Sequence, residues 1–124
     1  IIVHDGARPN LSNDLLNRLI NSFKKNPSVI IPTLSCIDTL KKVDSHNRVI
    51  ETVDRDDYVR VQTPQIIHPE ILKKAYKHSN YKTFTDESSL CEKYSEVFCI
   101  QGESNNIKVT FPEDLKRIEF LLTN

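Results

Sequence analysis

The stretch SNDLLNRLINSFKKNPSVIIP, residues 12–32, sets the fold class that we expect for this chain. Its first half carries apolar residues three and four positions apart, the period of one face of an α-helix. They are Leu15, Leu16, Leu19, Ile20 and Phe23. Ser12 or Asn13 can cap this helix, and Pro27 ends it. The apolar run within 28–32 then predicts a strand covered on both faces.

A first strand is expected at 1–3, directly before the polar motif HDGARP at 4–9. Strand, helix and strand within about thirty residues form a βαβ unit, which favours a parallel sheet. Ligands of such sheets collect at the carboxyl ends of the strands. The polar residues expected at such ends are Asp5, Arg8, Asp38, Thr39, Asn105, Asn106 and Lys108.

The segment DTLKKVDSHNRVIETVDR, 38–55, alternates apolar and polar residues around a polar turn at 44–47, which predicts a β-hairpin. Its charged residues argue against a place in the core, so we expect an arm that projects from the sheet. Arms of this kind are commonly covered by a partner subunit, because an exposed hairpin has unpaired edges.

The rest of the chain predicts three more helices and one more strand. The stretch at 59–67 is apolar but interrupted by Pro64. Helices are expected from Pro69, after Thr85 or Asp86, and from Pro112, with a strand at 96–100. The last helix is expected to turn four apolar residues inward: Leu115, Ile118, Leu121 and Leu122.

Composition argues against several classes of protein. Seventeen basic and 17 acidic residues cancel, which provides no overall field to attract nucleic acid or an anionic membrane. No apolar run is long enough to span a bilayer. The three cysteines lack C-x-x-C spacing, so neither a disulfide framework nor a zinc site is indicated. The only glycines are Gly6 and Gly102, and no G-x-G-x-x-G or P-loop is present.

Each polar cluster also fits an ordinary structural role. Asp5 with Arg8 fits a turn and a surface ion pair, and Lys108 fits an edge-strand lysine. Thr85 and Asp86 fit helix caps. Arg55 fits a solvated face, Asp38 and Thr39 fit a turn, and the stretch 62–65 fits an edge strand. The four histidines are scattered, and none is expected to act as a catalytic base.

The order of the motifs favours a specific family. HDGARP, DTLKKV, ETVDR, QTPQ, TDES and NNIKVT, the last followed by PEDL, resemble the 2-C-methyl-D-erythritol 4-phosphate cytidylyltransferases, from Ile2 to Leu122. The resemblance implies an α/β fold, a Rossmann-like nucleotidyltransferase sheet present in part, with a protruding β-hairpin dimerisation arm. The arm corresponds to 39–55 and would clasp a second copy in a homodimer. Residues 1–124 would be the C-terminal portion of a single cytidylyltransferase domain.

The resemblance also implies a reaction. The family transfers CMP from CTP to 2-C-methyl-D-erythritol 4-phosphate and releases pyrophosphate with the help of Mg²⁺, in a bacterial cytoplasm. By the same resemblance, Arg55 and Lys108 are catalytic and hold the attacking phosphate. The substrate-binding residues would be Asp5, Arg8, Thr39, Thr63 and Thr85, with Asp5 also next to the metal. Because the arm crosses over, Thr39 and Arg55 would serve the neighbouring subunit.

Departures from the family pattern leave more than one interpretation open. The family's glycine-rich CTP loop precedes its HDAARP motif, with which this chain begins, so we expect a C-terminal portion that is inactive alone. Phe111 replaces a capping threonine, which predicts a last helix without its side-chain cap. Ribitol-5-phosphate cytidylyltransferase shares several motifs, although TVDR and the basic KKV favour the methylerythritol enzyme. The sequence is also compatible with a fused cyclodiphosphate synthase and with a non-catalytic dimerisation module.

Overall fold

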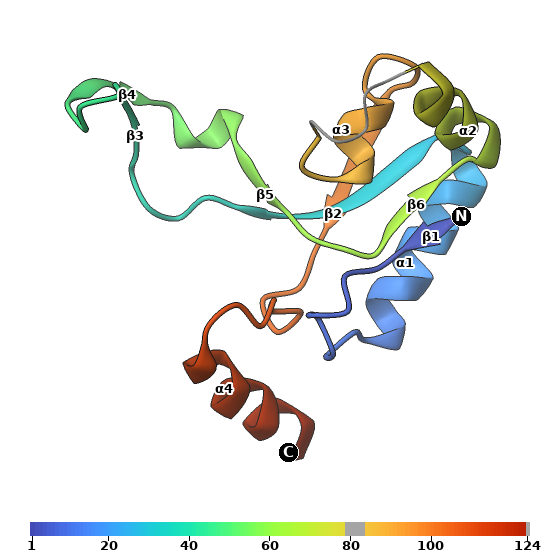
Figure 1. Cartoon of the computed structure of the whole chain (residues 1–124). Coiled ribbons are helices and arrows are strands. Elements are labelled where there is room, and N and C mark those ends of the chain that lie inside the picture. Colours follow the sequence, from blue (N-terminus) through green and yellow to red (C-terminus); the bar gives the residue numbers. More distant parts are fainter. Residues whose placement is uncertain (79–83, 124) are drawn as a thin grey trace.

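The computed structural model describes residues 1–78 and 84–123 and shows a mixed α/β fold with a separate hairpin (Figure 1). Its elements in chain order are β1 (Ile2–Val3), α1 (Asn13–Lys25), β2 (Val29–Ser35), β3 (Leu40–Val43), β4 (Val49–Val53), the 3-10 helix η1 (Arg55–Asp57), β5 (Val59–Val61), β6 (Gln65–Ile67), α2 (Pro69–His78), α3 (Glu87–Cys91), β7 (Val97–Gln101) and α4 (Pro112–Thr123). Among the described helices, none is long and apolar enough to cross a membrane.

Strand β2 is buried on both faces, as its apolar run predicted. On one face Ile30 packs with Leu15 and Leu19 of α1, whose first turn is capped by the Ser12 side chain. On the other face its neighbours Val29 and Ile31 pack with residues of β6, α2 and α3, which are Ile67, Leu72, Ala75, Leu90 and Cys91. Helices therefore cover both sides of the sheet at β2, and the predicted α/β class is confirmed.

The sheet is mixed, so the expectation of a parallel sheet is only partly correct. β6 lies between β1 and β2 and runs antiparallel to both, while β5 pairs antiparallel with the far end of β2. β1 and β2 thus run in the same direction without being paired with each other, and β2 and β7 form the directly parallel pair. The interpretation of 62–65 as an edge strand is wrong, because Gln62 and Gln65 are buried and β6 is an interior strand.

The predicted hairpin is present as the two-stranded sheet β3–β4, which stands away from the main sheet (Figure 1). The Asp44 carboxylate closes its turn by accepting the backbone N–H groups of His46 and Arg48. Val43, Val49 and Ile50 are about half exposed or more. The hairpin therefore presents apolar side chains that no described part of the chain covers.

Helix α4 differs from its sequence prediction in orientation and in capping. Ile118 is buried as expected, but Leu115 and Leu122 are 59% and 58% exposed, because the helix lies to one side of the sheet (Figure 1). The expected loss of a cap at Phe111 is offset from within the helix. Asp114 accepts the backbone N–H groups of Thr110 and Phe111, each at 2.9 Å, so its carboxylate fixes the first turn.

Candidate functional site

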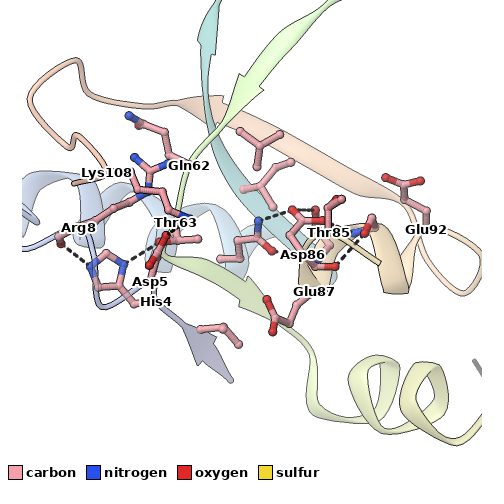
Figure 2. Close-up of a pocket in the computed structure, with 16 residues that line it drawn as sticks. His4, Asp5, Arg8, Gln62, Thr63, Thr85, Asp86, Glu87, Glu92 and Lys108 are labelled. Carbon is pink, nitrogen blue, oxygen red and sulfur yellow. Dashed lines mark hydrogen bonds and ion pairs between the residues drawn. The ribbon is translucent and has the colours of Figure 1, made fainter. Parts of the chain in front are cut away.

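A cavity of about 660 Å³, called here the main cavity, lies where β1, β6 and α3 approach each other (Figure 2). Five of the seven site residues expected from the sequence line it: Asp5, Arg8, Thr63, Thr85 and Lys108. They come from the HDGARP turn after β1, the segment between β5 and β6, the residues before α3, and the loop after β7. Distant motifs of the sequence thus meet at one site.

The centre of this site is an ion pair between Lys108 and Asp5, with Nζ and Oδ2 separated by 2.9 Å. The other carboxylate oxygen accepts the backbone N–H of Ala7 at 3.0 Å. The bond from Lys108, followed by that from Ala7, lowers the pKa of Asp5, so the carboxylate is ionised at neutral pH. The interpretation of Asp5 and Arg8 as a turn is confirmed, since the N–H of Arg8 donates to the carbonyl of Asp5 at 2.9 Å. The surface ion pair between their side chains is wrong, because the guanidinium of Arg8 donates to the carbonyl of Asn106 at 2.7 Å.

Thr63 is oriented by the backbone and by a histidine. Its Oγ1 accepts the N–H of Asp5 at 2.9 Å and lies 3.0 Å from Nδ1 of His4, while Nε2 of His4 lies 2.9 Å from the carbonyl of Arg8. A carbonyl can only accept, so Nε2 of His4 donates to the carbonyl of Arg8, and this bond fixes the ring with Nδ1 against the Thr63 hydroxyl. His4 is therefore a positioning residue that the sequence analysis missed.

Two buried amides attach the Lys108 loop to the sheet. The Gln62 side chain, 5% exposed, donates to the carbonyls of Glu103 and Asn106 and accepts the N–H of Glu103. The fully buried Asn106 donates to the carbonyl of Thr63 at 2.8 Å. A Cβ at Gly102 would lie 2.4 Å from the Gln62 side-chain oxygen, so this close approach requires glycine. We call these contacts the amide staple.

The opposite end of the main cavity is acidic. Asp86 caps α3 by accepting the N–H of Ser89, as its ordinary structural role predicted, and also accepts the side chains of Gln65 and Ser88. Burial raises the pKa of Asp86, but these hydrogen bonds lower it by more, so it falls below its ordinary value. Glu87 and Glu92 line the same end, whereas Lys108 and Arg8 lie at the other (Figure 2).

Thr39 and Arg55 do not line the main cavity of their own chain. Both are exposed and flank the hairpin, and the guanidinium of Arg55 donates to the carbonyl of Ile37. Neighbouring Asp54, Asp56 and Asp57 are also exposed, so within one chain Arg55 lies on a solvated face, as its ordinary structural role predicted. Their assignment to a site completed by a second copy stays a prediction.

No group of three His, Cys, Asp or Glu residues that could hold a metal occurs among the described residues. The metal ligand expected from the sequence, Asp5, is a single carboxylate with a side chain 26% exposed in the main cavity. Mg²⁺ commonly takes one or two carboxylates together with phosphate oxygens of a substrate. A single carboxylate such as that of Asp5 would fit this pattern of coordination.

Comparisons with known proteins agree on one family. The family model described as IspD, 2-C-methyl-D-erythritol 4-phosphate cytidylyltransferase, matches residues 1–124. The chain is 40% identical to the 2-C-methyl-D-erythritol 4-phosphate cytidylyltransferase of Acinetobacter baumannii, over 98% of this chain and 52% of that protein. It is 39% identical to a bifunctional IspD/IspF enzyme of Bartonella bacilliformis, over 92% of this chain and 30% of that protein.

A solved structure gives the same result. The chain superimposes on 4-diphosphocytidyl-2C-methyl-D-erythritol synthase of Anaerococcus prevotii with a TM-score of 0.85 and 32% identity, covering 99% of this chain and 58% of that one. The chain spans about half the length of the curated monofunctional relatives that it matches. These similarities do not favour the alternative interpretations, ribitol-5-phosphate cytidylyltransferase and a non-catalytic dimerisation module.

Proposed function

The chain belongs to the 2-C-methyl-D-erythritol 4-phosphate cytidylyltransferase family, and we propose that it provides the sugar-phosphate site of an enzyme that transfers CMP from CTP to that substrate. The observation that carries the proposal is the Asp5–Lys108 pair, with a hydroxyl of Thr63 beside it, in a cavity large enough for a small sugar phosphate. Lys108 supplies the cation for a phosphate, and the carboxylate and hydroxyl suit sugar hydroxyl groups.

The proposed reaction needs positioning more than covalent chemistry. An oxygen of the substrate phosphate attacks the α-phosphorus of CTP, a new P–O bond forms, and the bond to the pyrophosphate leaving group breaks. Lys108 reduces the repulsion between the two anions, and Thr63 and Thr85 orient the sugar through their hydroxyl groups. Asp5 would hold Mg²⁺, which supplies charge neutralisation at the phosphates when bound. No nucleophilic side chain is required.

We further propose that the hairpin forms a homodimer and carries Thr39 and Arg55 to the main cavity of the second copy. Support comes from the separation of β3–β4 from the sheet and from its exposed apolar residues (Figure 1). Isolated two-stranded hairpins are marginally stable in water, so coverage by a partner would stabilise this one. Arg55 would then grip the phosphate opposite Lys108.

The test is calorimetric titration of the 124-residue chain with 2-C-methyl-D-erythritol 4-phosphate. We expect binding that weakens about tenfold or more in Lys108→Met, because a charged hydrogen bond contributes roughly 1.5–3 kcal/mol. Lys24→Met is the matched control, since Lys24 is an exposed lysine at the end of α1 outside the cavity. Equal affinities of the two variants, or tighter binding of ribitol 5-phosphate, would refute the proposal.

We expect no CTP-dependent turnover from these 124 residues alone, since the sequence contains no glycine-rich phosphate loop. The measurement is pyrophosphate release with both substrates and Mg²⁺ present. Release above the background without protein would show that these residues suffice for CTP binding and catalysis, contrary to this expectation.

A further inference from the structure

The segment QTPQ, 62–65, supports the main cavity at two places. Thr63 lies between two buried glutamines, Gln62 with 5% and Gln65 with 1% of its surface exposed. Gln62 holds the Lys108 loop through the amide staple. Gln65 of β6 is bonded instead to the start of α3, which forms the opposite end of the main cavity (Figure 2).

Both polar atoms of the Gln65 side chain are used in this contact. Nε2 donates to Oδ2 of Asp86 at 2.8 Å, and Oε1 accepts the backbone N–H of Ser88 at 3.0 Å. An ionised carboxylate only accepts and a backbone N–H only donates, so the two partners fix the amide of Gln65 in one orientation. Because Gln65 and Ser88 are buried, water does not replace either bond if it is lost.

The first turn of α3 is held by polar bonds, and its second half by apolar packing. Oδ1 of Asp86 accepts the N–H of Ser89 at 3.0 Å, and Oδ2 also accepts the Ser88 hydroxyl at 2.8 Å. Leu90 and Cys91 belong to the apolar core. Asp86 therefore has a structural role, since three protein groups donate to its carboxylate, and Gln65 connects the turn that it caps to the sheet.

Thr85 directly precedes Asp86, is exposed and lines the main cavity. Its backbone position consequently depends on the position of the cap. We propose that Gln65 is a positioning residue for the substrate, which holds Thr85 at the main cavity through its bonds to Asp86 and Ser88. The inference rests on the proposed function, in which Thr85 orients the sugar, and it gives that site a further residue whose polar atoms are both taken by the protein.

Exchanging the polarity of the pair tests this role. Asp86→Asn keeps an oxygen for the helix cap, since Asn and Asp cap equally well, but it turns an N–H group toward the Nε2 donor of Gln65. Rotating the Gln65 amide by half a turn would only move the conflict to the N–H of Ser88. In Gln65→Glu/Asp86→Asn the new amide donates to the new carboxylate, which still accepts the Ser88 N–H. This double variant has the same net charge as the wild-type chain.

The first measurement is calorimetric binding of 2-C-methyl-D-erythritol 4-phosphate to the 124-residue chain. We expect about threefold to tenfold weaker binding in Asp86→Asn, as for the loss of one neutral hydrogen bond. The double variant should bind within about twofold of the wild-type chain. A simple charge effect has the opposite sign, because Asp86→Asn removes a negative charge from a site for an anion. Asp14→Asn is the matched control, since Asp14 is an exposed aspartate in the first turn of α1, outside the cavity.

Two further measurements separate positioning from a purely structural role. In a Thr85→Val background, Asp86→Asn should weaken binding by less than about a further twofold, because the hydroxyl on which it acts is absent. Hydrogen exchange at the Ser88 and Ser89 amides should be faster in Asp86→Asn and return to the wild-type rate in the double variant. This exchange readout needs no ligand and shows whether the new pair has formed.

The outcomes distinguish this inference from the proposed function. If the wild-type chain binds the sugar phosphate and Asp86→Asn binds it within about twofold, Gln65 has a structural role only, and the inference is wrong while the proposed function stands. Equal losses with Thr85 and with valine at this position, or a double variant that is not restored, also overturn the inference alone. If the wild-type chain does not bind the sugar phosphate, both proposals are overturned.

Discussion

Replacing Gln62 with leucine tests whether the amide staple holds the Lys108 loop. Gln62→Leu keeps most of the side-chain volume and removes three hydrogen bonds to the 103–106 segment. The carbonyl of Asn106 keeps its bond from Arg8, and the carbonyl of Glu103 keeps its bond from the backbone N–H of Asn106, so the main loss is at the backbone N–H of Glu103. A donor left without a partner costs about 1–3 kcal/mol, and this one is partly buried, so we expect a loss of about 1–2 kcal/mol in the free energy of unfolding.

For a chain of this size, that loss should lower the midpoint of thermal unfolding by about 3–10 °C. The assay is circular dichroism, together with hydrogen exchange at the Glu103 amide, which should exchange faster in Gln62→Leu. Gln101→Leu is the matched control, because Gln101 is an exposed glutamine of the same region whose side chain donates only to the adjacent Gly102 carbonyl. A midpoint for Gln62→Leu no lower than that for Gln101→Leu would refute the reasoning.

Replacing Gln62 with glutamate instead of leucine should make the stability of the fold depend on pH. In Gln62→Glu the carboxylate faces two carbonyls, which favours its protonated form and raises its pKa in the folded state above about 4.3. Stability is then best preserved at low pH and lost as the pH rises through that raised pKa. Chemical denaturation of Gln62→Glu at several pH values should show this trend, and the wild-type chain should show none from this position.

Three further predictions concern charge, thiols and assembly. Because its pKa is lowered in the folded state, Asp5 should stabilise the fold above its ordinary pKa of 3.8 and lose that contribution as the pH falls further. In urea denaturation at several pH values, Asp5→Asn should therefore lose less free energy of unfolding at low pH than the wild-type chain does. Maleimide should label exposed Cys99 in the native chain but buried Cys91, with a pKa raised to about 11, only after unfolding. Ile50→Lys should shift the light-scattering mass from dimer to monomer and lower the thermal midpoint, because the partner no longer covers the hairpin, and an unaltered mass would contradict the hairpin interface.

Local patterns predicted the local elements well. The apolar stripe of α1, the apolar run of β2 and the alternation in the hairpin each depend on neighbouring residues, and each is present in the structure. The direction of the sheet was harder to predict, because β6 enters between β1 and β2 through pairing of Ile2 with Ile66. Strand directions depend on such distant partners, which periodicity does not report.

The same contrast between local patterns and distant contacts applies to the site. The order of the motifs predicted Asp5, Thr63 and Lys108 as site residues, and the structure brings them to one cavity, but the contacts among them could not be predicted. Gln62 and Asn106 were missed as structural residues, because amide side chains are usually exposed and a single sequence does not show which of them are buried. Helix α4 is amphipathic in sequence, yet the side it exposes depends on what lies beside it, so half of its predicted inward residues proved exposed.

The Asp5–Lys108 pair and the amide staple have complementary roles in the proposed reaction. The staple consists of buried neutral amides, which hold the loop in place without adding charge to the cavity. The ion pair is partly exposed, with the Lys108 and Asp5 side chains 53% and 26% accessible, and exposed pairs of this kind contribute about 0–1 kcal/mol. A substrate phosphate can therefore take Lys108 from Asp5 at little cost, which leaves the carboxylate for a sugar hydroxyl or a metal ion. Firm support of the backbone with a weak bond between the charges is what a site needs if its cation must change partners when substrate binds.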